Sequence, residues 1–141
     1  MACKFCTTAF DPTLLIKETN AVRVALASPR LVAGHVVVFP KAHSARLSEL
    51  SWETRSELFE TVMEFQEKIM DRLASGCDIR YTSLPALPQH SDRAEHLHVH
   101  LYPREVNDDL FCRSQVFELA LLKDITLDEK VTIPRLLKDV Q

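Results

Sequence analysis

The amino-acid sequence predicts an α+β fold that combines an antiparallel sheet with one long helix. Short runs rich in β-branched residues lie before and after a single long segment with helical periodicity, residues 51–76. Strands grouped on both sides of one helix, rather than alternating with several helices, are typical of α+β proteins. The chain has only two glycines, which excludes both the G-x-G-x-x-G loop and the P-loop.

Three strands are expected before the long helix, over residues 13–18, 21–27 and 32–40. Thr19 and Asn20 would form the tight turn between the first two strands. The third run, VAGHVVVFP, is β-branched and ends at Pro40. Gly34 near its start would permit a bulge or a close approach of another segment.

The long helix is the clearest predicted element. Its apolar residues recur at helical spacing: Leu58, Phe59, Val62, Met63, Phe65, Ile69, Met70 and Leu73. Ser51 is a suitable N-cap, and Gly76 fits the position just after the helix end.

The segments after the helix predict two more strands and some helix. Residues 77–84 and 96–102 have strand character, and a loop with two prolines, residues 85–95, separates them. Residues 114–124 are expected to be helical, with one or two short helical turns around Pro134.

Length and charge narrow the function classes. The 141 residues suffice for one hydrophobic core. A net charge of −3 gives no electrostatic reason to expect duplex nucleic acid or an anionic membrane as a partner. No apolar run approaches the ~18 residues of a membrane helix, and the first ten residues lack the features of a secretory signal. We therefore expect a cytoplasmic protein.

Three of the six histidines occupy alternate positions of one predicted strand, in the segment EHLHVHLYPR. Because successive side chains of a strand point to opposite faces, His96, His98 and His100 share one face. The leucines and valine between them share the other face, which we assign to the core. A solvated strand face usually carries Thr, Lys or Glu, so the row indicates a need for imidazole itself. Imidazole can ligate a metal, transfer protons or act as a nucleophile.

The three histidines are poorly placed to bind one metal ion together. Positions 96, 98 and 100 of an extended strand span about 13 Å, at ~3.3 Å per residue, whereas Zn–N bonds are only about 2.0–2.1 Å long. A hydrolase with zinc on the row itself is therefore disfavoured, and at least two of the histidines must have another role.

A second group of residues offers a better metal site. Cys3 and Cys6 form a C-x-x-C pair, which in a reducing compartment is typical of a metal site or a redox pair rather than a structural disulfide. His43, just after a predicted strand, and His96, at the start of the histidine row, are candidates for the other two ligands of a tetrahedral zinc. The residues alone leave a redox pair open as the alternative.

These segments together resemble the histidine triad (HIT) superfamily of nucleotidyl hydrolases and transferases. HLHVHLY fits its signature His-φ-His-φ-His-φ-φ, where φ is hydrophobic. CKFC resembles the N-terminal C-x-x-C of zinc-containing members, AGHVVVFPKAHSARLSEL resembles a Gly-His strand followed by Pro-Lys-x-His, and HLYPR resembles the usual end of the triad strand. The resemblance covers about residues 3–104. We expect a single domain over residues 1–141, with an extension of uncertain structure at about 105–141.

The resemblance implies a fold, an assembly and a set of roles. The fold would contain a five-stranded antiparallel sheet, and the protein would be a homodimer. His98 would attack the α-phosphorus of a nucleotide substrate and form a nucleotidyl-histidine intermediate. His100 would lie near the phosphate and leaving group, and His35 would line the same pocket. A structural Zn²⁺ would be held by Cys3, Cys6, His43 and His96, the four residues considered above.

The loop before the triad departs from the family pattern. Relatives usually carry an Asn there, and a glycine-rich stretch ending in Gly-Gln-Ser/Thr, which contact the ribose and phosphate. This chain has no glycine in the loop and places Asp92 and Arg93 at the last two of those positions. Arg93 is a candidate for the missing phosphate contact, because guanidinium binds phosphate bidentately; its alternative role is a solvated loop charge. Thr82 or Ser83 is a candidate replacement for the Asn.

Two functions follow from these observations. The first is an enzyme acting on nucleoside 5′-phosphoryl substrates such as dinucleoside polyphosphates, nucleoside phosphoramidates or aminoacyl-adenylates. The second is a non-catalytic nucleotide-binding or interaction module that kept the HIT scaffold. The intact triad favours the enzyme, and the divergent loop favours the module.

Overall fold

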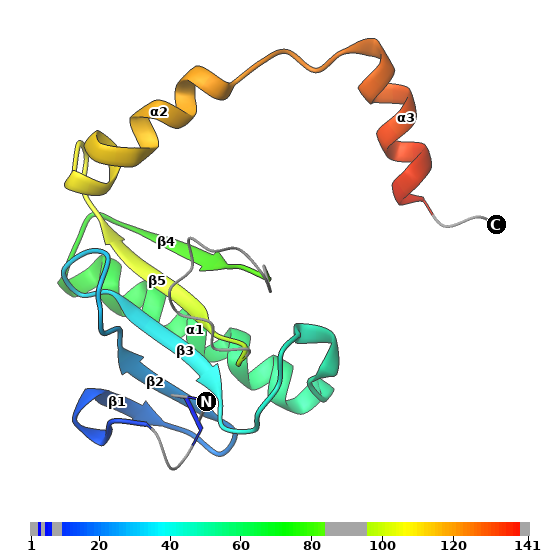
Figure 1. Cartoon of the computed structure of the whole chain (residues 1–141). Coiled ribbons are helices and arrows are strands. Elements are labelled where there is room, and N and C mark those ends of the chain that lie inside the picture. Colours follow the sequence, from blue (N-terminus) through cyan, green and yellow to red (C-terminus); the bar gives the residue numbers. More distant parts are fainter. Residues whose placement is uncertain (1–2, 4, 7–9, 84–95, 139–141) are drawn as a thin grey trace. The chain divides into compact units, whose positions relative to one another are not determined.

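The computed structural model describes residues 3, 5–6, 10–83 and 96–138. The chain forms two compact units, Met1–Asp108 and Asp109–Gln141. The described residues of the first unit contain a five-stranded sheet in the order β1-β2-β3-β5-β4, with every neighbouring pair antiparallel (Figure 1). The strands are β1 (Leu15–Glu18), β2 (Val22–Leu26), β3 (Val36–Pro40), β4 (Gly76–Tyr81) and β5 (Val99–Arg104). The predicted fold class, an α+β fold with a five-stranded antiparallel sheet, is confirmed.

Helix α1 (Trp52–Arg72) lies against one face of this sheet (Figure 1). The main core fills the space between them and is built from valine, leucine, isoleucine and phenylalanine side chains of both layers: Val22, Val24, Val36, Val38, Leu50, Leu58, Val62, Phe65, Ile69, Leu97, Val99 and Leu101. A second cluster on the opposite face contains Phe5, Ala25, Val37 and Phe39. The central strand β3 is buried at every position because it is covered on both faces.

Helix α1 begins as expected and ends earlier. The Ser51 side chain accepts a hydrogen bond from the Thr54 backbone N–H, as an N-cap does. The helix stops at Arg72, and Gly76 is the first residue of β4 rather than the residue after the helix. The Glu105 carboxylate accepts hydrogen bonds from the Ser75 backbone N–H and hydroxyl, at 2.8 and 2.6 Å. These bonds hold the chain beside the end of β5, where β4 starts.

The strand bounds around the triad also differ from the prediction. Strand β5 starts at Val99, not residue 96, because the backbone before it pairs outside the ladder: the Leu97 N–H donates to the Ser44 carbonyl. Strand β3 starts at Val36, not residue 32. The chain bends before it at Gly34, whose φ is +78°, and a Cβ there would lie 3.0 Å from Pro103 Cγ. The close approach predicted at Gly34 is confirmed.

The second unit is helical in its described part. Phe111–Gln115, α2 (Val116–Glu118) and Leu119–Leu121 form one continuous helical stretch, which begins and ends about three residues earlier than expected. Helix α3 (Leu127–Leu137) contains Pro134 and is longer than the one or two turns expected there. Thr126 caps it reciprocally with Glu129. Among the described residues of the chain, no helix has the length and apolarity that a membrane crossing requires.

Candidate active site and metal centre

The histidine row lies on the sheet face opposite α1. Leu97, Val99 and Leu101 are buried in the core against the helix, so the alternating side chains of His96, His98 and His100 point to the other face. The alternation expected from the sequence therefore holds, even though the regular strand begins only at Val99. Four neighbouring elements give the three imidazoles different surroundings: the C-x-x-C segment, the segment after β3, the segment before β3, and β4.

Four sulfur and nitrogen atoms converge at the first histidine of the row. The Cys3 Sγ lies 3.4 Å from His96 Nδ1, and the Cys6 Sγ lies 3.8 Å from it. The Cys6 Sγ is also 3.4 Å from His43 Nδ1. All four ligand atoms lie within 4.8 Å of one another. Zn–S bonds of about 2.3 Å and Zn–N bonds of about 2.0–2.1 Å place tetrahedral ligand atoms roughly 3.3–3.8 Å apart, so this donor set fits zinc.

Hydrogen bonding and burial favour the tautomer and the neutral charge state of His96 that metal coordination requires. Its Nε2 lies 2.7 Å from the Pro40 carbonyl oxygen and donates to it, which leaves the lone pair on Nδ1, toward the thiols. Burial lowers the pKa of His96, which favours the neutral form that ligation requires. The side-chain hydrogen bond with Cys3 raises the pKa of Cys6, because it stabilises the protonated thiol of Cys6. If both residues were thiolates, their adjacent negative charges would repel each other, and a bound cation would offset that repulsion.

The second histidine of the row is held in one tautomer. His98 Nδ1 lies 2.8 Å from the carbonyl oxygen of His96 and donates its proton there. In a neutral ring, the lone pair is then on Nε2, the nitrogen that can attack an electrophile. The Phe5 ring packs against the imidazole at a centroid distance of 4.9 Å. His98 is half-buried, so the fixed ring remains accessible from the open face.

The third histidine belongs to a chain of hydrogen bonds that starts before β3. The Leu31 backbone N–H donates to His35 Nδ1 at 3.1 Å, so a neutral His35 carries its proton on Nε2. That nitrogen lies 2.8 Å from His100 Nδ1 and donates to it. His100 consequently carries a proton on Nε2 and can donate it. Burial, followed by the nearby charges of His98 and Arg80, lowers the pKa of His35 to about 4, so His35 is neutral at pH 7.

The remaining predicted residues are not brought into these contacts. Ser83 is exposed and lies two residues beyond the end of β4. Arg93 lies outside the described residues. Sequence reasoning missed Phe5, which packs on His98 from within the C-x-x-C segment. It also missed Arg80 on β4, which pairs directly with His100. Strand alternation could have placed Arg80 on one face, but the pairing register was needed to put it opposite His100.

The geometry defines a row of three histidines beside a cluster of four potential metal ligands on an open sheet, and a comparison with protein families identifies its class. The HIT domain family model matches residues 10–107. The chain therefore belongs to the HIT family. A search of curated proteins found no match.

Solved structures share the fold at low sequence identity. A HIT family protein from Bacillus anthracis aligns with a TM-score of 0.62 and 21% identity, covering 86% of this chain and 79% of that chain. A zinc-bound histidine triad family protein from Mycobacterium smegmatis aligns with a TM-score of 0.59 and 22% identity, covering 71% of each chain. Diadenosine triphosphate hydrolase from Plasmodium falciparum aligns with a TM-score of 0.58 and 18% identity, covering 79% of this chain and 75% of that chain.

Proposed function

We propose that the protein is a nucleotidyl hydrolase or transferase that works through a covalent nucleotidyl-His98 intermediate. The observation that carries the proposal is the pair of opposite tautomers in neighbouring rings. His98 donates from Nδ1 to the His96 carbonyl, whereas His100 accepts at Nδ1 from His35. One ring therefore presents a lone pair at Nε2 and the other presents a proton. A nucleophile beside a proton donor is the arrangement that group transfer from phosphorus requires.

The reaction would proceed in two steps. His98 Nε2 attacks the α-phosphorus, the bond from phosphorus to the leaving oxygen or nitrogen breaks, and His100 gives its Nε2 proton to the leaving group. Water or another acceptor then attacks the α-phosphorus, His100 takes the proton of the acceptor, and the phosphorus–Nε2 bond breaks. His98 returns to its starting tautomer because Nδ1 remains bonded to the His96 carbonyl.

The four-residue cluster supports a structural zinc ion. Cys3, Cys6, His43 and His96 would be its ligands, and the M. smegmatis relative is itself zinc-bound. Bound zinc would supply folding energy by joining the N-terminal segment to the sheet. A complete set of four protein ligands leaves no open position for a substrate, so the chemistry falls to the chain's own imidazoles.

The substrate class rests on family relationships and on the chemistry of the site. One relative is a diadenosine triphosphate hydrolase, and another, from Candida albicans, is a histidine triad nucleotide-binding protein. We propose a nucleoside 5′-phosphoryl substrate, with Ser83 and Arg93 as further substrate-binding residues at the start and within the loop before the triad. The alternative is a nucleotide-binding module without turnover, which the divergent sequence of residues 85–95 favours.

A trapping experiment separates the two functions. The protein is mixed with a panel of adenylyl and guanylyl substrates, quenched in alkaline denaturant during turnover, and analysed by peptide mass spectrometry. The enzyme would carry a nucleoside monophosphate on the peptide that contains His98, and the His98→Ala variant would carry none. Nucleotide binding with neither turnover nor an adduct would establish the module instead.

We also propose that the protein is a cytoplasmic homodimer. Strand β4 is an edge strand, and an unpaired edge needs cover. Phe59, Met63 and Met70 lie on one side of α1 with more than two fifths of each side chain exposed. Sedimentation at micromolar concentration should give twice the 16.1 kDa chain mass, and Met63→Glu should weaken the dimer. A 16.1 kDa species in the wild type at that concentration would contradict this assembly.

A further inference from the structure

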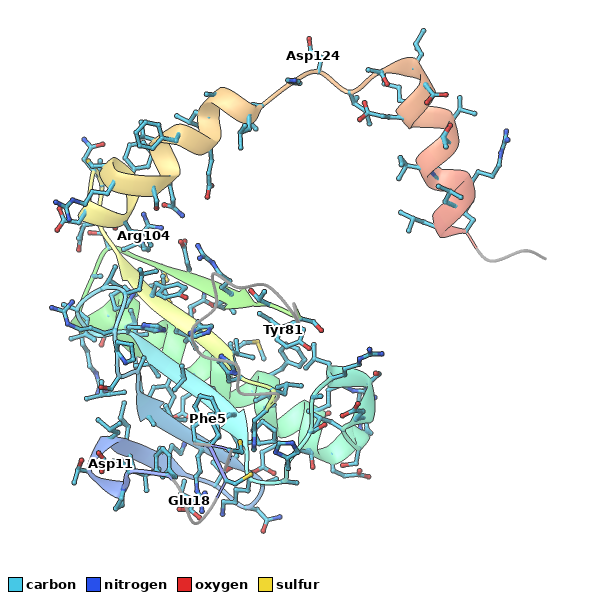
Figure 2. The ribbon with its side chains drawn as sticks, in the orientation of Figure 1. Phe5, Asp11, Glu18, Tyr81, Arg104 and Asp124 are labelled. Carbon is cyan, nitrogen blue, oxygen red and sulfur yellow. The ribbon has the colours of Figure 1, made fainter. Side chains whose placement is uncertain are left out.

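Arg80 lies on the same face of the sheet as the histidine row, next to its third member. In the β4–β5 ladder, Arg80 is the direct partner of His100, and Tyr81 is the partner of Val99. Directly paired residues of an antiparallel ladder point to the same face. Val99 and Tyr81 pack in the core beside α1, so Arg80 and His100 point away from it. Figure 2 shows Tyr81 at the end of this strand pair that is opposite Arg104.

An aromatic side chain holds the Arg80 guanidinium in place. Its central carbon lies 5.1 Å from the centroid of the Tyr102 ring, within cation–π distance. The Tyr102 ring is parallel to the His100 ring within 6°, with centroids 5.6 Å apart. Tyr102 also packs against His35, at a centroid distance of 4.4 Å. The cation is therefore positioned by the same ring that supports the proton-donating histidines.

The charge of Arg80 is not neutralised by a carboxylate within residues 10–83 and 96–138. Its side chain is exposed, and it takes part in none of the ion pairs between described residues. Arg104, at the other end of the strand pair, offers a contrast, since it binds both Asp78 and Asp108. The positive charge of Arg80 acts electrostatically on the histidine site, since it contributes to the lowered pKa of His35.

We propose that Arg80 is a substrate-binding residue that holds an anionic phosphate of the leaving group, and that the enzyme therefore prefers nucleoside polyphosphates to phosphoramidates with an amine leaving group. This inference rests on the proposed function, which places the α-phosphorus at His98 and the leaving group at His100. Arg80 lies across the ladder from His100, on the leaving-group side. A departing phosphate gains negative charge that guanidinium binds in a bidentate manner. A departing amine gains a proton and offers no such anion.

Two substrates with the same adenylyl group and different leaving groups test the inference. We would compare diadenosine triphosphate with an adenosine 5′-phosphoramidate of an alkylamine, using the full-length wild type, Arg80→Ala and Arg80→Lys. Arg80→Ala should lower kcat/KM for the polyphosphate by about tenfold to a hundredfold, the scale of lost hydrogen bonds to a charged group. The phosphoramidate should change by less than about threefold. Arg80→Lys should recover only part of the loss, since ammonium lacks the planar fork.

Arg72→Ala is the matched control, because Arg72 is an exposed arginine on α1 beside Asp71. It should leave both substrates unchanged. Equal losses on both substrates in Arg80→Ala, or a loss in neither, would overturn the inference while the proposed function stands.

A binding measurement keeps the inference testable if the proposed function fails. ADP carries a phosphate at the leaving-group position and AMP does not. Arg80→Ala should weaken ADP binding by about tenfold or more and leave AMP binding within about threefold, as measured by calorimetry. If the wild type turns over neither substrate, the proposed function is wrong. Unchanged ADP affinity in Arg80→Ala would then also reject Arg80 as a phosphate-binding residue.

Discussion

The two ends of the histidine row show how one residue type serves two chemistries on a single strand face. His96 is almost fully buried, donates from Nε2 to the Pro40 carbonyl, and turns Nδ1 toward two thiols. His100, four residues later, is only half-buried and accepts at Nδ1 from His35. The partner of one ring nitrogen decides the use of the other nitrogen. His96 is therefore suited to hold a metal, and His100 is suited to give a proton.

The largest expected effect comes from removing the histidine between these two ends. His98→Ala should lower kcat/KM by roughly 10⁴–10⁶, the scale of deleting a covalent nucleophile. The fold should persist, because the His98 side chain is half-buried and its Nδ1 donates a hydrogen bond to the backbone carbonyl of the nearby His96. Turnover by the purified variant and its melting temperature check this prediction. Zinc content equal to that of the wild type would be the control, and activity within tenfold of the wild type would exclude His98 as the nucleophile.

Removing one ligand of the proposed zinc site should lower the stability of the fold before it affects catalysis. We expect one zinc ion per chain in the wild type, and none in Cys3→Ser or His43→Ala. Each variant should melt about 10 °C lower or more, since a structural zinc site contributes several kcal/mol of folding free energy. Cys112→Ser is the matched control, because Cys112 is an exposed cysteine outside the cluster. Protein purified without chelator that holds no zinc, or that contains a Cys3–Cys6 disulfide, would contradict the site.

Replacing His35, which supports the proton-donating His100, should change the pH dependence of the free energy of unfolding. The pKa of His35 is about 4 in the folded chain against an ordinary 6.5, so the unfolded chain binds a proton first as the pH falls. Stability from this group is complete above about pH 6.5 and declines toward pH 4. At pH 5 the loss should be about 2 kcal/mol. Urea unfolding measures the free energy of unfolding at pH 7 and pH 5. Between these pH values, this free energy should fall by about 2 kcal/mol less in His35→Asn than in the wild type.

A pH dependence of unfolding that is the same in His35→Asn and the wild type would mean that His35 is not the buried, neutral ring described above. His35→Asn should also lower kcat, because it removes the group that fixes the His100 tautomer. Since His35 acts through His100, it is a positioning residue, and the acidic limb of the kcat–pH profile should shift in the variant.

The sequence sufficed for those features that depend on local periodicity or on residue type. Alternation placed the three histidines on one face, and the chemistry of thiolates and imidazoles selected the four residues that the structure brings together. It did not suffice for features that depend on pairing between distant strands. The loop of residues 85–95 leaves the β4–β5 register undetermined, so the position of Arg80 opposite His100 could not be foreseen.

Some strand bounds were missed for a related physical reason. The backbone at Leu97 bonds to Ser44 instead of joining the ladder, which delays β5 to Val99. The bond between His35 and His100 joins residues 65 apart in the sequence. No local pattern encodes such a contact, although the family resemblance implied that both residues would lie near each other.

The smallest expected effect concerns the contact between the C-x-x-C segment and His98. In the sequence, Phe5 lies between Cys3 and Cys6, and its ring packs on Phe39 at a centroid distance of 4.7 Å and on His98 at 4.9 Å. Phe5→Leu keeps an apolar side chain there and removes the ring contact, so we expect a loss of stability below about 1.5 kcal/mol. Since His98 would lose one of its supports, kcat should fall about twofold to fivefold with zinc content unchanged.

Phe10→Leu isolates that effect from general packing. The Phe10 ring also packs on Phe39, at 5.6 Å, but no ring contact between Phe10 and His98 occurs in the described part of the chain. The control should therefore lose similar stability and keep its kcat. If both variants lower kcat equally, the effect comes from the packing around Phe39. If only Phe5→Leu does so, the segment that carries the proposed metal ligands Cys3 and Cys6 also holds His98 in position, and the metal end of the row is coupled to His98 through one phenylalanine.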